Sequence, residues 1–314
     1  MPTPPSESQP ARIVAVVVTF NRLTLLQDLV GRLRRTPELA EVVVVDNAST
    51  DGSAEWLAAL PDTPGSVPVH AVTLDDNRGG AGGFHEGMRI GLARGAGLLW
   101  LMDDDGMPDD DCLVKLLEHH GELDFWGPVV VDKDDAERLV FPIRLPGGTQ
   151  VVHAMADVRE AASDGRIDDI VIPFNGVLVT RELADRIGLP RAEFFIWGDD
   201  HEYRLRAEEA GARIATVVDA TVRHPSVGSL GTPMMFGRTT YNHSPSDLKH
   251  YCMARNNVVN LRTYRGLPHV AAFVVKTVWF YAFTRPSSAR LRLSARGIVA
   301  GLRNDFTGHG RFLA

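Results

Sequence analysis

Short apolar runs alternate with amphipathic segments along the amino-terminal third of the chain. The runs have strong strand preference and are expected to form buried strands at residues 12–19, 41–46, 69–74 and 98–102. The intervening segments repeat their apolar residues with helical spacing and are expected to form helices at residues 23–35, 53–60 and 82–95. Such alternation is typical of an α/β fold whose mostly parallel sheet is covered by helices on both faces.

Polar or acidic side chains follow each of the four expected strands. In a parallel sheet the carboxyl ends of the strands meet at one edge, and ligands bind there. That edge would collect the groups at Thr19–Arg22, Asp46–Asn47, Asp75–Asn77 and Asp103–Asp105. Their co-location predicts the ligand site of the protein.

Three adjacent carboxylates, Asp103, Asp104 and Asp105, end the fourth expected strand in the run WLMDDDG. Like charges at this spacing repel one another unless a counter-charge is present. Strand alternation places Asp103 and Asp105 on one side and Asp104 on the other. Two converging carboxylates suit Mg²⁺ or Mn²⁺ shared with a diphosphate. The alternative is a helix N-cap, the role that we expect of Asp109–Asp111 before the helix CLVKLLEHH.

Two further features of this edge indicate a nucleotide. A carboxylate at Asp46 can accept the N3–H of a pyrimidine; the alternative is an Asx turn followed by a helix cap at Ser49 or Asp51. The segment 75–88 is dense in glycine, which lets the backbone approach a ligand closely, and the helix N-terminus that follows favours an anion. No G-K-[ST] follows, so this segment is not a P-loop.

Composition narrows the range of functions. The 314 residues carry a net charge of −7, which does not favour binding to nucleic acid. The two cysteines, Cys112 and Cys252, lack metal-site spacing and fit a reducing compartment. Residues 1–10 are polar and rich in proline, lack the regions of a signal peptide, and are expected to form a disordered tail.

Four motifs occur in an order that is typical of one enzyme family: VVVTFNR, VVVVDNASTDGS, DNRGGAGGF and LMDDDG. They resemble the nucleotide-sugar half of family 2 inverting glycosyltransferases, which have the GT-A fold. NRGGAGGFHEGM together with WLMDDDG more narrowly resembles bacterial galactofuranosyltransferases of the shorter, initiating type, and also some rhamnosyltransferases. The resemblance continues through residues 174–211 and 221–225, so it covers most of residues 12–225.

This resemblance implies a division of the chain and a reaction. The GT-A domain would span residues 11–230, with a nucleotide-binding half (11–106) and an acceptor half (107–230), before a carboxyl-terminal helical segment (231–314). The reaction would transfer galactofuranose from UDP-galactofuranose to a glycan or polyprenyl-linked glycan by single displacement, with Mn²⁺ or Mg²⁺. A rhamnosyltransferase using dTDP-rhamnose is the near alternative, and no residue separates the two.

The resemblance also assigns residues to the donor site. Asp103 and Asp105 would bind the metal ion, and His224 at the end of an expected strand would complete its shell; a packed histidine is the alternative. Contacts to the nucleotide-sugar are expected from Thr19, Arg22, Asp46, Asn77, Gly79, Gly80 and Asp104.

Asp199 and Asp200 stand just before an expected amphipathic helix. An inverting transfer needs a carboxylate that removes the proton of the acceptor hydroxyl. By resemblance Asp200 matches the family's general base and Asp199 is the nearest substitute, whereas the alternative is an N-cap. We assign the acceptor to Asn175, to Trp197, which is otherwise a core residue, and to Arg255. Arg255 and Asn256 resemble an R-N pair of related transferases, in which the arginine could bind the diphosphate or an acceptor phosphate; the alternative is a solvated helix face.

The carboxyl-terminal segment combines an apolar run with basic residues. The run at 270–283 contains Lys276 and falls below the roughly 18 residues expected of a membrane-spanning helix. Residues 285–314 carry six arginines and one aspartate, a local charge of +5. We expect this segment to lie on an anionic membrane surface, at the cytoplasmic face of the cell membrane. The alternative is packing against the catalytic domain or a partner subunit.

Two other classes of protein fit less well. A sugar nucleotidyltransferase would need a glycine-rich, basic loop directly after the first strand, and VVVTFNRLT contains none. A non-catalytic nucleotide-sugar-binding protein would not need both the metal set and the pair Asp199–Asp200.

Overall fold

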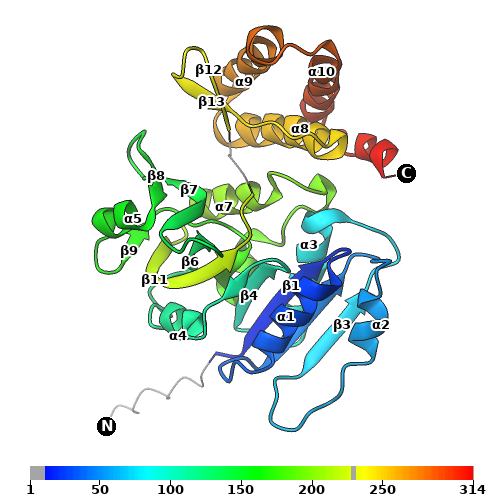
Figure 1. The fold of residues 1–314 in the computed structure, drawn as a ribbon, viewed down its shortest axis with the longest axis vertical. Coiled ribbons are helices and arrows are strands. Elements are labelled where there is room, and N and C mark those ends of the chain that lie inside the picture. Colours follow the sequence, from blue (N-terminus) through cyan, green and yellow to red (C-terminus); the bar gives the residue numbers. More distant parts are fainter. Residues whose placement is uncertain (1–10, 228–230, 314) are drawn as a thin grey trace.

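A computed structural model describes residues 11–227 and 231–313. The expected disordered tail, residues 1–10, and the expected domain boundary at residue 230 lie outside these residues. The eight strands of the main path of the central sheet (Figure 1) are β1 (Ile13–Thr19), β2 (Glu41–Asp46), β3 (Val69–Thr73), β4 (Leu98–Asp103), β5 (Met107–Pro108), β6 (Phe125–Asp132), β10 (Asn175–Thr180) and β11 (Ile214–His224).

The strand order is β3-β2-β1-β4-β10-β6-β11-β5. The first four strands are parallel, as expected, and so are β6 and β11. β10 is antiparallel to both β4 and β6, so the sheet is mixed. β10 is separated from β4 in the chain by residues 104–174, so the two strands are not joined by a single βαβ crossover, which would make them parallel. It brings Asn175 beside Met102, next to the acidic triplet.

Helices cover both faces of this sheet. One face packs against α1 (Leu23–Leu33), α2 (Ser53–Ala58) and α4 (Cys112–Leu117). The other packs against α3 (Gly79–Ala93), α6 (Arg181–Ile187) and α7 (Asp199–Glu209). Alternate residues of β1 enter the two apolar clusters, with Ile13, Ala15 and Val17 in one and Val14, Val16 and Val18 in the other. The continuous apolar runs of the sequence therefore reflect burial on both faces.

Helix α3 contains the glycine-rich segment instead of following it. The helix begins at Gly79, three residues before its expected start at residue 82. A Cβ at Gly83 would lie 2.3 Å from Val18 Cγ1, one at Gly87 2.4 Å from Val16 Cγ1, and one at Gly91 2.6 Å from a Leu99 Cδ atom. A spacing of four residues puts these glycines on one face of the helix. They let α3 pack closely on the sheet, so packing accounts for these three glycines, and a ligand contact at Gly79 and Gly80 stays a prediction.

The caps of the helices differ from expectation. Asp111 precedes α4, but its side chain makes no capping hydrogen bond; the three carboxylates of Asp109–Asp111 pair instead with Arg223, Arg32 and Lys115. The capping prediction for these residues is therefore wrong, because basic side chains lie within their reach. Asp51 accepts hydrogen bonds from the backbone N–H groups of Leu23, at 2.8 Å, and Ser53, at 3.1 Å. It thus serves the beginnings of both α1 and α2.

A smaller layer lies beside the acceptor half of the sheet. It consists of β7 (Arg138–Arg144), β8 (Val151–Ala154), α5 (Met155–Ala161) and β9 (Arg166–Asp168). β7 is antiparallel to β6 and β8, and β9 is antiparallel to β11. A third apolar cluster, which includes Val129, Ile143 and Val158, holds this layer on the sheet.

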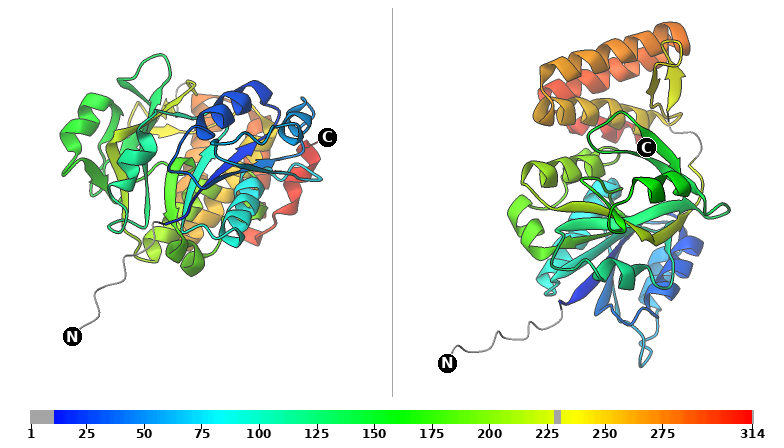
Figure 2. Two further views of the ribbon diagram at one scale, coloured as in Figure 1. Left: turned by 90° about the horizontal axis from the view of Figure 1, so that it is seen from below. Right: turned by 90° about the vertical axis from the view of Figure 1, so that its left-hand side faces the viewer.

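The carboxyl-terminal segment forms a helical layer above the sheet (Figures 1 and 2). Its elements are β12 (Thr232–Met234), β13 (Thr239–Tyr241), α8 (Asp247–Tyr264), α9 (Leu267–Trp279), the π-helical turn η2 (Phe280–Thr284), α10 (Ser288–Arg303) and the 3₁₀ helix η3 (Thr307–Phe312). α10 packs closely on α8, since a Cβ at Gly297 or Gly301 would lie 2.8 or 2.4 Å from a backbone oxygen of α8.

The apolar helix of this layer is longer than the sequence run 270–283 predicted. α9 begins at Leu267, with a proline in its first turn, and continues through η2, so that the apolar helix Leu267–Thr284 has 18 residues. By length and composition alone it could cross a membrane, and only 22% of it is buried. The sequence run 270–283 underestimated the helix because its ends are less apolar than its centre.

Candidate active site

The acidic triplet at the end of β4 lies against Arg22, which precedes α1. Arg22 Nη1 donates to Asp104 Oδ1 at 2.9 Å and also contacts Asp105 Oδ2. Thr19, the last residue of β1, donates its hydroxyl to Asp104 Oδ2 at 2.6 Å. His224, the last residue of β11, places Nε2 3.1 Å from Asp105 Oδ1. Strand ends far apart in sequence therefore meet at one edge, which we call the donor rim.

Electrostatics differ among the three carboxylates. Burial raises the pKa of Asp103 well above its ordinary value, and the negative charges of Asp105, Asp104 and Asp199 raise it further. Burial also raises the pKa of Asp104, although Thr19 and Arg22 oppose the effect. Burial acts on Asp105 too, but its hydrogen bond and ion pair with His224, together with Arg22, lower its pKa overall. Arg22 lowers the pKa of Asp103 as well, but Asp103 is the member of the triplet that forms no ion pair within the described residues.

The chemistry of Asp103, Asp105 and His224 fits a divalent cation. Two carboxylates and an imidazole nitrogen are suitable ligands for Mn²⁺. The 3.1 Å between Asp105 Oδ1 and His224 Nε2 is a hydrogen-bond distance, so a metal ion bound by both side chains would replace this hydrogen bond. Among the described residues no group of three such side chains already converges, and Arg22 engages the second oxygen of Asp105. The rim therefore supplies two candidate ligands that are bonded to each other, together with Asp103, which forms no ion pair within the described residues.

Asp46 lies at the end of β2 and is fully buried. Its Oδ1 accepts a hydrogen bond from the Ser49 N–H at 3.2 Å, so an Asx-type turn is present. Its Oδ2 has no hydrogen-bond partner within the part of the chain that the structure describes. A buried carboxylate oxygen without a donor is unfavourable, so an acceptor is left for a ligand group.

The other expected donor contacts lie where β3 leads into α3. Asn77 Oδ1 accepts from the Gly79 N–H at 2.8 Å. Gly79 has a φ of +67°, and a Cβ there would lie 2.0 Å from the backbone oxygen of Phe195. Gly79 is therefore required by packing against that carbonyl. Gly80 has no atom within 4 Å of its Cβ position, so it alone leaves room for a ligand.

Asp199 and Asp200 begin α7, and no lysine or arginine forms an ion pair with either of them in the described residues. Burial and the charge of Asp200 raise the pKa of Asp199 to about 8. Burial raises the pKa of Asp200 as well, although the His201 N–H donates to its Oδ1 at 2.6 Å. Since Asp199 also acts on the pKa of Asp103, the pair lies close to the donor rim.

A cavity of about 930 Å³ adjoins Asp200. Asp200, His201 and Arg204 of α7 form one wall, and the opposite wall is largely apolar and includes Phe141 and Pro173. Asp199 does not line this cavity. The two neighbouring carboxylates therefore have different surroundings, with Asp199 buried beside the rim and Asp200 at the larger space.

Two of the expected acceptor residues lie near this region. Asn175 is buried at the start of β10 and donates to the Pro173 carbonyl at 3.0 Å. Trp197 is half-buried in the loop before α7, with a φ of +67°. Their contact with a sugar stays a prediction.

Arg255 is fully buried in α8. Its guanidinium donates to the backbone oxygens of Phe194, at 2.7 Å, and Phe306, at 3.1 Å, and its Nε donates to Asn256 Oδ1 at 2.9 Å. These contacts correct both readings of Arg255. It is not on a solvated helix face, and its donors are engaged by carbonyls instead of facing an acceptor.

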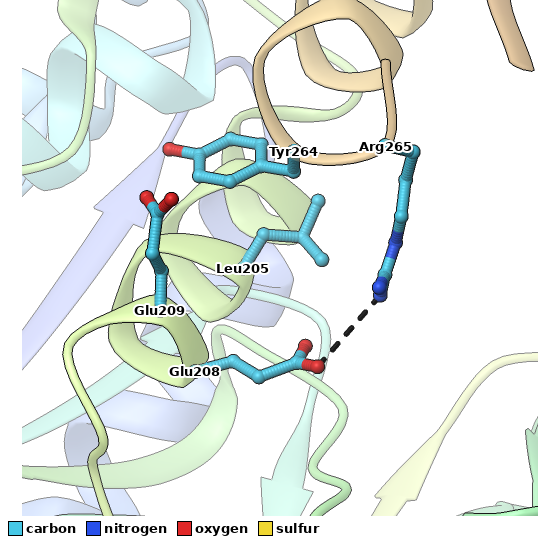
Figure 3. Close-up of a pocket in the computed structure, with 5 residues that line it drawn as sticks. All are labelled: Leu205, Glu208, Glu209, Tyr264 and Arg265. Carbon is cyan, nitrogen blue, oxygen red and sulfur yellow. Dashed lines mark ion pairs between the residues drawn. The ribbon is translucent and has the colours of Figure 1, made fainter. Parts of the chain in front are cut away.

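A smaller pocket of about 240 Å³ lies between α7 and the end of α8 (Figure 3). Glu208 and Arg265 flank it, with an ion pair of 3.7 Å between them. Both residues also line the larger cavity, so the pocket extends that cavity toward the carboxyl-terminal layer.

Sequence reasoning missed the residues that hold the loop 193–198. Asn256 and Asn260 of α8 donate to its carbonyls, and the Phe195 carbonyl accepts from the Ala81 N–H of α3 at 3.1 Å. The only available signal was the pairing of Asn256 with Arg255 in the sequence, which does not reveal a contact across about 60 residues.

Comparison with known proteins decides the family. The model of the family "Glycosyl transferase family 2" matches residues 14–159. The galactofuranosyltransferase GlfT1 of Mycolicibacterium smegmatis is 32% identical over 94% of this chain and 97% of its own length. The chain belongs to glycosyltransferase family 2. The transferase is also 31% identical to GlfT1 of Mycobacterium tuberculosis, over 87% of this chain and 90% of the relative. It is 25% identical to the dTDP-rhamnosyl transferase RfbF of Shigella flexneri, over 97% of this chain and 99% of the relative.

Solved structures confirm the expected GT-A fold. The transferase matches the crystal structure of GalNAc-T7 with UDP, GalNAc and Mn²⁺ with a TM-score of 0.60 and 13% identity, over 98% of this chain and 59% of that chain. The mannosyltransferase PcManGT from Pyrobaculum calidifontis, in complex with GDP-Man and Mn²⁺, matches with a TM-score of 0.51 and 18% identity, over 98% and 79%. The predictions of a family 2 enzyme that resembles galactofuranosyltransferases are thereby confirmed. Its metal ion, donor, acceptor and membrane contact stay predictions.

Proposed function

We propose that the protein is a metal-dependent inverting galactofuranosyltransferase that uses UDP-galactofuranose. The observation that carries the proposal is the presence of two clusters of aspartates that lie near each other. Asp103–Asp105 lie with Arg22 and His224 at the strand ends, and Asp199–Asp200 lie at the start of α7 without an ion pair in the part of the chain that the structure describes. A single displacement needs these two environments, one for the charge of the diphosphate and one for the proton of the acceptor.

In the proposed donor site, Asp103, Asp105 and His224 would hold Mn²⁺ or Mg²⁺. When bound, the ion would neutralise negative charge on the departing diphosphate. Arg22 lies beside Asp104 and Asp105 and would add a positive charge at the diphosphate. Asp46 would accept the N3–H of uracil through its unpartnered Oδ2, and the open space at Gly80 would admit the donor.

Asp200 would act as the general base, with Asp199 as the substitute. The acceptor hydroxyl would attack the anomeric carbon as its proton passes to the carboxylate, and the bond from that carbon to the diphosphate would break. The larger cavity beside Asp200 supports an acceptor on this side. Attack opposite the leaving group inverts the anomeric configuration.

The relatives support galactofuranose over rhamnose. Identity is 32% to the galactofuranosyltransferase GlfT1 and 25% to the rhamnosyl transferase RfbF, each over nearly the whole chain. The acceptor would be a glycan or a polyprenyl-linked glycan. The apolar helix Leu267–Thr284 and the arginines that follow it would place the enzyme on the cytoplasmic face of a membrane.

A donor panel tests this function. The full-length protein is incubated with UDP-galactofuranose, UDP-galactopyranose or dTDP-rhamnose, each with Mn²⁺ or with EDTA, and the release of nucleoside diphosphate is measured. We expect release from UDP-galactofuranose that depends on Mn²⁺. Release only from dTDP-rhamnose would establish the near alternative. Absence of release from every donor, by a protein that still binds UDP, would favour a nucleotide-sugar-binding protein without catalysis.

A further inference from the structure

The loop 193–198 determines where Asp199 and Asp200 lie, because it leads directly into α7. Its backbone is unusual. Phe195 and Trp197 each have a φ of +67°, and Gly198 has a φ of +84°. The left-handed region costs bulky residues on the order of 1–3 kcal/mol and persists only where the surroundings enforce it. Contacts from other elements must therefore maintain this loop.

Two asparagines of α8 make such contacts. Asn256 Nδ2 lies 2.6 Å from the carbonyl oxygen of Trp197, 3.0 Å from that of Phe194 and 3.1 Å from that of Ile196. Asn260 Nδ2 donates to the carbonyl of Gly198 at 2.9 Å. The asparagines are four residues apart on one face of α8, and both are buried. Together they hold four of the six residues of the loop.

The opposite side of the loop contacts the donor half. The Phe195 carbonyl accepts from the Ala81 N–H at 3.1 Å, and Gly79 packs directly against the same carbonyl. The loop thus lies between α3, which begins at the donor rim, and α8 of the carboxyl-terminal layer. A shift of α8 would be transmitted to Asp199 and Asp200 through four carbonyl groups.

We infer that Asn256 and Asn260 are positioning residues for glycosyl transfer. Their amide groups donate to the carbonyls of Phe194, Ile196, Trp197 and Gly198. This sets the direction of the Asp199 and Asp200 carboxylates toward the acceptor. The carboxyl-terminal layer is thereby part of the active site as well as a candidate membrane surface. The inference rests on the proposed function, because it takes Asp199 and Asp200 as the groups that receive the proton.

A matched control lies on the same helix. Asn257 is adjacent to Asn256 and partly exposed, and its side chain makes no hydrogen bond within the described residues. Asn256→Ala, Asn260→Ala and Asn257→Ala cause the same change in side chain and helix propensity. They differ in the contact with the loop.

We expect Asn256→Ala to lower kcat for transfer by about 10- to 100-fold, since small misplacements of catalytic groups have effects of this size. Asn260→Ala, which loses one hydrogen bond, should lower kcat by a smaller factor, and Asn257→Ala should leave it unchanged. KM for the donor and the affinity for UDP should stay within about twofold of native in all three, because the donor rim is intact. Rates are expressed per UDP-binding site, so a loss of folded protein does not count as a loss of catalysis.

Asn256→Asp preserves the shape of the side chain but removes the N–H donors, so it should be impaired at least as strongly as Asn256→Ala. Near-native kcat in Asn256→Asp or Asn256→Ala would overturn the inference. So would a rise in donor KM without a fall in kcat. If Asn256→Ala does not fold, Asn260→Ala alone decides, and equal kcat in Asn260→Ala and Asn257→Ala would overturn it.

A double-mutant cycle links the asparagine to the base. If Asn256 acts through Asp200, then Asn256→Ala should have little further effect on kcat in the Asp200→Asn background. Fully additive losses would contradict positioning and indicate an independent role. If Asp200→Asn and Asp199→Asn both stay active, the proposed base has failed. If they are inactive and Asn256→Ala matches Asn257→Ala, only the positioning inference has failed.

Discussion

The two groups of adjacent carboxylates differ in what surrounds them. At the donor rim, Arg22 contacts Asp104 and Asp105, and His224 lies 3.1 Å from Asp105. At the start of α7, no basic side chain pairs with Asp199 or Asp200 among the described residues, and burial raises the pKa of Asp199 to about 8. Cations bond directly to two carboxylates of the first group, whereas in the second group Arg204 lowers the pKa of Asp200 without an ion pair.

This difference in surroundings suits the two groups to different chemical roles. Asp105, whose pKa His224 and Arg22 lower, stays ionised and can exchange these cations for a metal ion, as a metal–diphosphate site requires. A carboxylate that is buried without a cation has a higher affinity for a proton, as a general base requires. Neighbouring aspartates in one sequence can therefore take different roles, because the elements packed around them differ.

The largest expected effect comes from removing the proton acceptor. Asp200→Asn keeps the shape of the side chain and removes its basicity, so transfer should fall by on the order of 10²-fold or more. The rate of sugar transfer to an acceptor glycan measures this. If Asp200→Asn is near-native while Asp199→Asn is inactive, the two roles are exchanged. If both variants are active, α7 does not supply the base.

A second test separates packing from ligand binding among the glycines of α3. Gly87→Ala would put a Cβ 2.4 Å from Val16 Cγ1, and overpacking of this kind lowers the free energy of unfolding by about 1–3 kcal/mol. Gly80→Ala meets no atom within 4 Å and should leave the stability unchanged while raising KM for the donor. Thermal unfolding and donor kinetics are compared. Equal losses of stability in both variants would refute this division.

The pH dependence of stability distinguishes the carboxylates directly. The folded pKa of Asp199, about 8, is above its unfolded value of roughly 4. Its contribution to the free energy of unfolding is therefore complete below pH 4 and is lost as the pH rises to 8. Asp199→Asn should make that decline shallower, by at most ~1.4 kcal/mol per pH unit. An identical slope in urea unfolding of the two proteins would contradict a raised pKa at Asp199.

The contribution of Asp105 to stability changes with pH in the opposite direction to that of Asp199. Because His224 and Arg22 lower its pKa overall, its contribution to stability is present above its unfolded pKa and is lost as the pH falls through its folded pKa, in the acid range. Asp105→Asn should therefore reduce acid sensitivity below about pH 4, where Asp199→Asn has no effect.

The smallest effect concerns the carboxyl-terminal layer. Val275 and Val278 are 59% and 46% exposed on α9, so Val275→Asp/Val278→Asp should reduce sedimentation with anionic liposomes roughly threefold or more. Val114→Asp, at a valine that is 44% exposed on α4, is the control. Substitution is preferable to truncation near residue 265, because truncation would also remove α10 from α8. Equal sedimentation of the variants and the native protein would favour packing against a partner subunit.

The strands of residues 11–106 and the polar residues at their ends could be predicted because short stretches of sequence specify them. Four apolar runs mark the strands, of which β1, β2 and β4 are buried on both faces and the edge strand β3 is partly exposed. The polar residues at their ends meet because parallel strands end at one edge. Thr19, Arg22, the acidic triplet and His224 do come together there. Arg22 was expected to contact the nucleotide-sugar, yet its contact with Asp104 and Asp105 depends on side-chain conformations that strand and helix patterns do not specify.

The acceptor half depends on contacts between distant residues. Asn256 bonds to Trp197 across 59 positions, and a polar residue in a helix looks the same in sequence whether it faces water or a loop. Arg255 was misread for this reason. The antiparallel β10 and the full length of the apolar helix were missed because they depend on how the chain continues, not on the apolar run itself.

Calorimetry of UDP binding tests most directly whether the two groups of carboxylates have different roles. UDP is titrated into the native protein, Asp105→Ala and Asp200→Asn, each with Mn²⁺ and with EDTA. The control is Asp134→Ala, at an exposed aspartate that pairs with Lys133. Mn²⁺ should tighten UDP binding to the native protein, the control and Asp200→Asn, but not to Asp105→Ala. Equal UDP affinity with and without Mn²⁺ in the native protein, or loss of the metal effect in Asp200→Asn, would contradict the account.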